Sequence, residues 1–298
     1  MNIKYLFLLT GLCVSLLFSH AAAARMLVVG TISDEPVKET RTFLPFAEHL
    51  AAQLAGQGIT SGEVRIARDI GHMAALLRAG EVDIYVDSPL VSLAVSAKGG
   101  SRLVARRWKK GVAQYHSVLF ARRDSGIRSL QDLKGRVVAF EEAFSSSGYI
   151  LPRLAISERA VPLAALPGPR AARPQSGTGY VFSGDDENTI EWVLRGLVDA
   201  GAMSLYSLKK RAGDDFEDLE IILKTDAIPR HVVSLSPGTS ATLAEAVQAA
   251  LTGMDQSEAG RVVLQGFERT TKFDVIPEHT REMLEHFQGP VTELIGSQ

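Results

Sequence analysis

Three consecutive hydroxyl side chains, Ser145, Ser146 and Ser147, are the residues whose types and spacing most directly suggest chemistry. An apolar, strand-like segment (residues 136–140) precedes them, and Gly148 and a helix-like apolar pattern follow. A hydroxyl-rich loop that ends at a helix N-terminus directs O–H groups, free backbone N–H groups and the positive end of the helix dipole into one small volume. The pattern therefore predicts an oxyanion receptor. Helix capping by the serines is the structural alternative, and the pattern alone leaves it open.

The first 24 residues have the features of a secretory signal peptide. Lys4 supplies the positive charge, residues 5–18 form an apolar stretch, and residues 21–24 are alanines suited to cleavage. The stretch is shorter than the roughly 20 residues of a bilayer span. We therefore predict export to the periplasm and cleavage near Ala24. The only cysteine, Cys13, lies in this segment, so the mature chain is expected to lack disulfides and thiol chemistry.

The composition favours a globular protein of one large or two medium cores. The 298 residues are 46% hydrophobic and carry a formal net charge of −2, which argues against a general nucleic-acid binder. One basic cluster, at residues 102–110, includes Arg106, Arg107, Lys109 and Lys110, interleaved with apolar residues. We interpret it as the solvated face of a strand. No nucleotide loop or metal-ligand spacing is present, so no cofactor and no metal are expected.

Strand-like and helix-like segments alternate along the chain, which favours an α/β fold with mostly parallel sheets. A long strand is expected at residues 112–122, and a second α/β unit begins near residue 118. Residues 160–179 are rich in proline, alanine and glycine and are expected to form a surface loop. Helices at residues 242–254 and 278–287 are expected to close the chain.

Several short motifs follow one another in an order that resembles one known family. They are Gly80-Glu81-Val82-Asp83-Ile84, Pro89, Tyr115-His116-Ser117, Arg123-Asp124-Ser125-Gly126-Ile127, Ser129-Leu130-Gln131-Asp132-Leu133-Lys134-Gly135, Ser145-Ser146-Ser147-Gly148-Tyr149, Gly196-Leu197-Val198-Asp199-Ala200-Gly201 and Ile228-Pro229. In this order the chain resembles the phosphate-, phosphite- and phosphonate-type periplasmic substrate-binding proteins of ABC importers. The resemblance extends from about residue 27 to residue 273.

The resemblance implies a two-lobed periplasmic-binding-protein fold whose α/β lobes, joined by two crossing segments, close over a small ligand. Residues 25–115 and 206–290 would form the first lobe, and residues 116–205 the second. The serine loop would hold the ligand's oxyanion. Tyr115 would line the cleft, or it is a strand aromatic packed in the core. Its neighbour His116 would point away, because side chains alternate along a strand.

Several residues depart from the family pattern. Asp185 stands where many members have a histidine that donates to the oxyanion. A carboxylate there needs a proton, a bridging cation or a different ligand to contact the bound molecule, or it only caps the next helix. Tyr206 and His231 stand where some members have acidic residues for an aminoalkyl group, which makes an aminoalkylphosphonate a poor candidate. Asp87, in the loop before Pro89, either faces the cleft or forms a turn.

No constellation of catalytic residues is apparent, so the protein is predicted not to be an enzyme. We predict a monomeric binding protein that captures a small oxyanion and delivers it to the membrane permease of an ABC importer. The alternative is a ligand-responsive sensor of the same fold that docks on a signalling receptor or kinase. An exported hydrolase would need residues brought together from distant positions.

Overall fold

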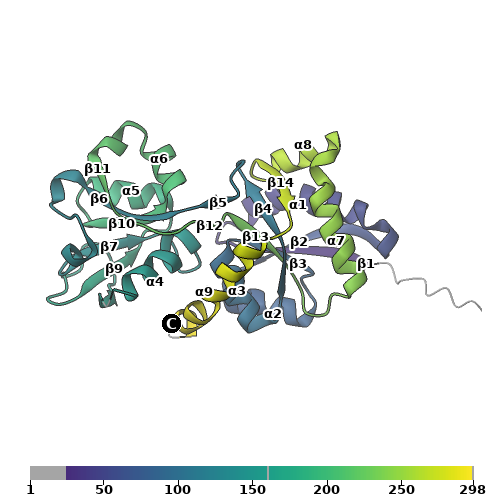
Figure 1. Ribbon diagram of the computed structural model, residues 1–298, viewed down its shortest axis with the longest axis horizontal. Helices are drawn as coiled ribbons and strands as arrows, with labels where there is room; N and C mark the ends of the chain where they lie inside the picture. The colour runs from purple at the N-terminus through teal and green to yellow at the C-terminus, as the bar shows by residue number, and fades with distance from the viewer. Residues whose placement is uncertain (1–24, 160, 297–298) are drawn as a thin grey trace, which may run out of the picture.

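The computed structural model describes residues 25–159 and 161–296. The predicted signal peptide lies outside these residues. Two α/β lobes lie side by side along the longest axis of the molecule (Figure 1). The expected fold class is therefore confirmed.

The first lobe is built on a sheet with the strand order β14-β4-β13-β3-β1-β2. Its strands are β1 (Arg25–Ile32), β2 (Ile59–Ala67), β3 (Ile84–Asp87), β4 (Arg102–Lys109), β13 (His231–Leu235) and β14 (Thr270–Asp274). β1, β2, β3 and β4 run in one direction, and β13 and β14 run in the other. The helices of this lobe are α1 (Pro36–Gln53), α2 (Ile70–Ala79), α3 (Pro89–Gly99), α7 (Ala241–Gly253) and α8 (Glu258–Gly266).

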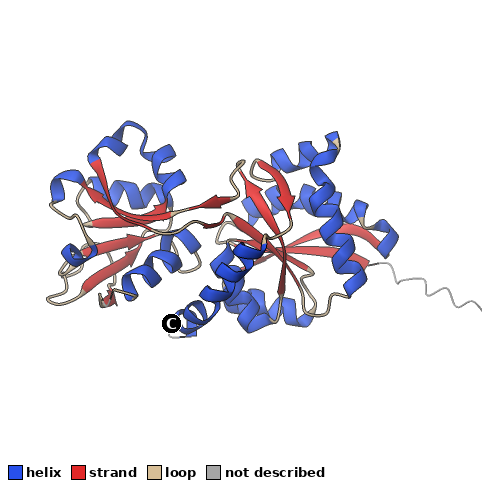
Figure 2. Cartoon of the chain, in the orientation of Figure 1, coloured by secondary structure: helices blue, strands red, loops and turns tan. Residues whose placement is uncertain are grey.

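The second lobe has a sheet with the order β11-β6-β10-β7-β9-β8. Its strands are β6 (Ser117–Arg122), β7 (Val137–Phe140), β8 (Leu163–Ala165), β9 (Thr178–Phe182), β10 (Ala200–Ser204) and β11 (Leu219–Lys224). Only β6 runs against the others. Helices α4 (Leu151–Ser157), α5 (Asp186–Leu194) and α6 (Leu205–Ala212) flank this sheet (Figure 2). Short 3₁₀ turns are η1 (Ala55–Gln57), η2 (Arg123–Ser125), η3 (Leu130–Leu133), η5 (Gly213–Asp218) and η6 (Met254–Gln256).

Two strands carry the chain between the lobes. β5 (Gln114–Tyr115) and β12 (Ile228–Pro229) pair antiparallel, with Tyr115 opposite Ile228 (Figure 1). The second crossing comes later than the predicted boundary at residue 206. β11 pairs with β6, and Leu208 and Leu219 are buried in the core of the second lobe, so the chain stays in that lobe until about residue 224.

Two local predictions require correction. The strand expected at residues 112–122 is interrupted at His116, where β5 ends and β6 has not begun. The segment at 160–179, expected to be a loop, contains β8, which pairs parallel with β9 at the edge of the sheet. Edge strands tolerate nearby prolines because one of their sides lacks a ladder partner.

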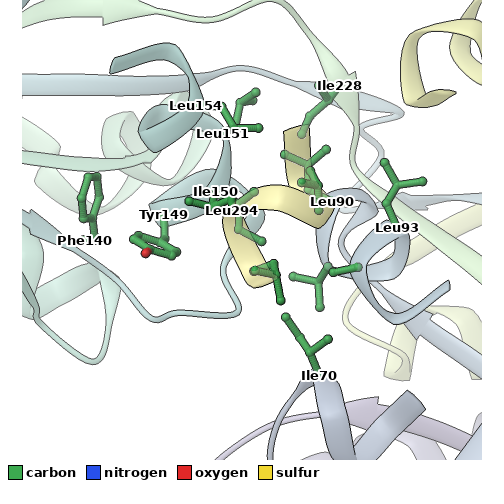
Figure 3. Close-up of a cluster of buried hydrophobic side chains, with 14 of the residues drawn as sticks. Ile70, Leu90, Leu93, Phe140, Tyr149, Ile150, Leu151, Leu154, Ile228 and Leu294 are labelled. Carbon is green, nitrogen blue, oxygen red and sulfur yellow. The ribbon is translucent and has the colours of Figure 1, made fainter. Parts of the chain in front are cut away.

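The two lobes share one hydrophobic cluster. Leu90 of α3, in the first lobe, belongs to the same buried cluster as Ile150 and Leu151 of the second lobe. The closing helix α9 (Glu278–Gly296) is longer than predicted and adds Leu284 and Leu294 to the cluster. Figure 3 shows Leu294 among these side chains. The lobes are therefore joined by packed side chains as well as by the two strands.

Candidate functional site

A cavity of about 730 Å³ lies between the lobes. It is lined by the ends of β1 and β3 and the start of α1 from the first lobe, and by the serine loop and the start of α5 from the second. The cavity brings together these predicted site residues: Asp87, Tyr115, Ser145, Ser146, Ser147, Asp185 and His231. Tyr206 is not among the lining residues. It lies on α6 with 36% of its surface exposed, and its neighbour Ser207 reaches the cavity instead.

Ser146 connects the serine loop to the other lobe. Its Oγ accepts hydrogen bonds from the backbone N–H groups of Leu90, at 3.1 Å, and Val91, at 3.3 Å. These groups belong to the first turn of α3, whose own N-cap residue Ser88 makes no side-chain cap. Ser146 therefore caps a helix of the first lobe from the second lobe.

The other two loop serines also have partners. Ser145 begins the short π-helix η4 (Ser146–Ile150), accepting from the Gly148 N–H at 2.9 Å and donating to Glu141 Oε2 at 2.6 Å. The backbone carbonyl oxygen of Ser147 accepts a hydrogen bond from the Ser117 hydroxyl at 2.6 Å. The loop is consequently fixed in place by its own residues and by both lobes.

Arg230 is one of the basic residues that line the cavity. It follows β12 at the second crossing, and its guanidinium lies over the Tyr115 ring, 4.8 Å from the centroid. Only 9% of the residue is exposed, and no carboxylate in the described part of the chain pairs with it. Burial raises the pKa of Tyr115 to about 12, so the phenol is neutral beneath this cation.

Three more nitrogen-bearing side chains, Lys109, Lys110 and His231, line the cavity near Arg230; together these four residues are called the hinge wall. Burial, with the nearby charges of Lys109 and Arg230, lowers the pKa of Lys110 to about 8. Burial and the adjacent cations Lys109 and Arg107 lower the pKa of His231 well below its usual value, so its ring is neutral.

The interpretation of residues 102–110 as a solvated strand face is therefore wrong for its second half. Arg107 is fully buried against the Phe267 ring, 3.8 Å from its guanidinium, and Lys109 and Lys110 reach the cavity. The alternation of charged and apolar residues along β4 was visible in the sequence. What covers the charged face is β14 and the turn before it, far away in the chain.

Asp87 lies at the end of β3 on the floor of the cavity. Its carboxylate accepts from the Ser88 N–H at 2.6 Å and the Tyr85 hydroxyl at 3.0 Å, with longer contacts to Thr31 and Ile32. Burial raises its pKa despite these donors. Asp87 thus lines the cavity and also organises the surrounding backbone.

Asp185 has the capping geometry that the sequence left open. Its carboxylate accepts from the Asn188 N–H at 2.6 Å at the start of α5, and the residue also lines the cavity. The next two acidic residues, Asp186 and Glu187, pair with Arg211 of α6. Since its oxygens are already used within lobe two, Asp185 acts first as a helix cap.

Carboxylates outnumber basic side chains around the cavity. Burial, followed by the charge of Asp186, raises the pKa of Glu141 to about 7. Burial and the charges of Glu141 and Asp34 raise that of Glu142 to about 8. Glu141 and Glu142 are therefore partly protonated at neutral pH, while Lys110 and Arg230 of the hinge wall remain cations without an ion-pair partner in the described chain.

Within residues 25–159 and 161–296, no group of three or more histidine, cysteine, aspartate or glutamate side chains is arranged to hold a metal ion.

Among the helices that the structure describes, none combines the length and the apolar character needed to cross a membrane.

A ligand-sized cavity between two α/β lobes, joined by two crossing strands, defines a two-lobed periplasmic binding protein. The chain belongs to the family of periplasmic phosphonate-binding proteins of ABC transporters, whose family model matches residues 29–279. The resemblance found in the sequence is therefore confirmed.

Solved structures extend the comparison. The chain is 26% identical to XAC2383 of Xanthomonas citri bound to chloride, with a TM-score of 0.86 over 92% of this chain and 99% of that one. XAC2383 has also been solved with ATP, at 25% identity and a TM-score of 0.85, covering 91% and 98% of the two chains. PhnD1 of Prochlorococcus marinus, in complex with methylphosphonate, is 17% identical with a TM-score of 0.64 over 92% and 99%, which shows the fold alone.

One curated relative is a signalling protein. The tetrathionate sensor histidine kinase TtrS of Salmonella typhimurium is 25% identical over 185 residues, or 60% of this chain. The match spans 29% of the kinase's length.

Proposed function

We propose that this protein is an exported binding protein that captures a small anion in the cleft between its lobes and delivers it to the permease of an ABC importer. The ligand is an oxyanion of the phosphate, phosphite or phosphonate class. The observation that carries this proposal is that Arg230 lies buried at the cavity without a carboxylate partner in the described chain.

An arginine that is 9% exposed and whose guanidinium has no carboxylate partner among the described residues is costly to keep in a protein. Stacking on Tyr115 offsets part of that cost. A bound anion would supply the missing partner through paired N–H donors, which are the strongest hydrogen bonds that arginine makes to oxyanions. The cavity in front of Arg230 leaves room for such a ligand.

The surroundings of Arg230 support the same ligand class. Lys110 contributes a second cation that has no ion-pair partner in the described chain, and Ser146 and Ser147 bring hydroxyls from the opposite lobe. Because Arg230 belongs to the crossing segment, a ligand held there would contact the hinge and both lobes at once. Closure of the lobes would then follow from contacts that only the closed form completes.

Calorimetric titration of the purified protein with inorganic phosphate, phosphite and methylphosphonate tests the proposal, with Arg230→Gln as the main variant. Loss of a charge-assisted contact should raise the Kd of the bound anion by at least about tenfold. Arg195→Gln, an exposed arginine on the outside of the second lobe, serves as the matched control and should leave the Kd unchanged. Equal affinities for the wild type and Arg230→Gln would refute the proposal.

A sensing role is the second candidate, and the match to a sensor histidine kinase favours it. In that case the ligand-bound form would dock on a receptor instead of a permease. The neighbouring genes distinguish the two roles, since permease and ATPase genes indicate import and a kinase gene indicates sensing.

A further inference from the structure

Glu268 lies beside the hinge wall and forms ion pairs with two basic residues, Lys109 of the wall and Arg107 behind it. Its Oε1 lies 2.6 Å from Lys109 Nζ, and its Oε2 lies 3.0 Å from a terminal nitrogen of Arg107. The carboxylate also lines the cavity. One acidic side chain therefore neutralises part of a basic cluster at the place where an anion would bind.

The backbone that presents Glu268 adopts a conformation that side chains other than glycine rarely use. Glu268 has φ 51° and Arg269 has φ 55°, both left-handed. They face another left-handed residue, Lys110, with φ 58°, whose N–H donates to the Arg269 carbonyl at 2.9 Å. Two tight turns thus hold each other, one carrying Lys110 and the other carrying Glu268. Such conformations persist only where the surrounding structure enforces them, and they cluster at binding sites.

Arg107 is unavailable to a ligand. It is completely buried, donates to Thr270 Oγ1 at 2.8 Å and to the Phe267 carbonyl at 2.9 Å, and stacks on the Phe267 ring. Its ion pair with Glu268 therefore holds that carboxylate in place. The free face of that carboxylate is turned to Lys109, which leaves Lys110 and Arg230 as the cations of the hinge wall without an acidic partner in the described chain.

We propose that Glu268 determines the charge of the ligand, acting as a resident counter-ion that withholds Lys109 from the bound anion. This inference rests on the proposed function, because it assumes that the anion lies at the hinge wall. With Glu268 in place, the wall offers fewer free positive charges, and an anion of high charge must also approach a fixed carboxylate. The site therefore favours anions of lower charge over dianions of the same shape.

Sulfate and perchlorate test this idea, because both are tetrahedral and they differ by one unit of charge. Their Kd values are measured by calorimetry at neutral pH for the wild type and Glu268→Gln. Freeing Lys109 should raise the preference for sulfate over perchlorate by about tenfold. The double variant Glu268→Gln with Lys109→Gln should return this ratio to within about threefold of the wild type. Glu258→Gln, an exposed glutamate of α8, controls for the change in net charge.

The outcomes separate the two proposals. If the wild type binds either anion but Glu268→Gln leaves the ratio unchanged, the role of Glu268 is wrong and the anion site stands. If neither anion binds to any of the proteins, the role of Glu268 is wrong, and the titrations with phosphate, phosphite and methylphosphonate decide the proposed function separately. Should Glu268→Gln not fold, Lys109→Gln replaces it. That variant should weaken sulfate binding less than Lys110→Gln does, and an equal or larger loss would contradict the proposal.

Discussion

The hydroxyl oxygen of Ser146 lies 3.1 Å from the backbone nitrogen of Leu90, so a serine of the second lobe caps a helix of the first. The contact is buried and lies beside the hydrophobic cluster that both lobes share. It makes the serine loop a structural link between the lobes as well as part of the cavity wall.

Replacing Ser146 by alanine should therefore weaken the protein even without ligand. Loss of a helix-capping oxygen lowers the free energy of unfolding by about 1 kcal/mol. Urea unfolding of the ligand-free protein measures this change. Ser240→Ala, which removes the cap of α7 within one lobe, provides a comparison of similar size. Unchanged stability of Ser146→Ala would show that the cap contributes nothing.

The unfolding of the two lobes is expected to be coupled. Each lobe carries one tryptophan, Trp108 on β4 and Trp192 on α5, so the single-tryptophan variants Trp108→Phe and Trp192→Phe report on one lobe each. One buried cluster contains residues of both lobes and of α9. In each variant, the fluorescence transition should therefore coincide with the loss of helical circular dichroism. Two separated transitions would mean that the shared cluster does not couple the lobes.

Gly148 allows the serine loop to pack against Glu141. A β-carbon at this position would lie 2.5 Å from Glu141 Cβ and 2.9 Å from Ser145 Oγ, which is too close for real contacts. Gly148→Ala should lower the free energy of unfolding by roughly 1–3 kcal/mol, because the loop must shift. Chemical denaturation measures the effect. Gly168→Ala, where nothing lies within 4 Å, is the control and should be almost neutral.

The raised pKa of Glu142 gives a pH dependence with a definite sign. The folded protein retains this proton up to about pH 8, whereas the unfolded chain releases it near its usual pKa of 4.5. The contribution of Glu142 to stability is therefore complete below about pH 4.5 and is lost as the pH rises to 8. His231, whose pKa is depressed, acts in the opposite direction below its usual value of 6.5.

Glu142→Gln isolates this contribution. Relative to the wild type, the variant should gain thermal stability as the pH increases from 5 to 8. Thermal unfolding followed at several pH values measures the difference between the two proteins. Glu158→Gln, an exposed glutamate of the second lobe, should show no such trend. A constant difference between wild type and Glu142→Gln would mean that Glu142 titrates normally.

The sequence predicted the fold well, because alternating strands and helices and a series of short motifs are local patterns. It also indicated residues that the structure gathers around the cavity, including Tyr115 and the serine loop. It missed Arg230 and Glu268. Arg230 acts through its position over Tyr115, which belongs to the other crossing strand. Glu268 acts through its ion pair with Lys109, which is more than a hundred residues away in the sequence.

The limits of the second lobe could not be read from local pattern either. α6 and β11 resemble any amphipathic helix and edge strand. The pairing of β11 with β6 and the burial of Leu208 and Leu219 in the second core assign them to the second lobe. Similarly, the charged residues of β4 look solvated until β14 is placed beside them. Long-range pairing decides such cases, and a single sequence does not display it.

The pairing of Tyr115 with Ile228 brings the entrance and the exit of the second lobe next to each other. The whole lobe is thus one uninterrupted insertion whose two ends meet at a single point on the first lobe. Such an insertion is a single continuous segment that could be replaced as a unit. Its exchange for the matching lobe of a related protein would need only two chain junctions, together with side chains that match the cluster shared by both lobes. The product would combine the hinge wall of one protein with the serine loop of another.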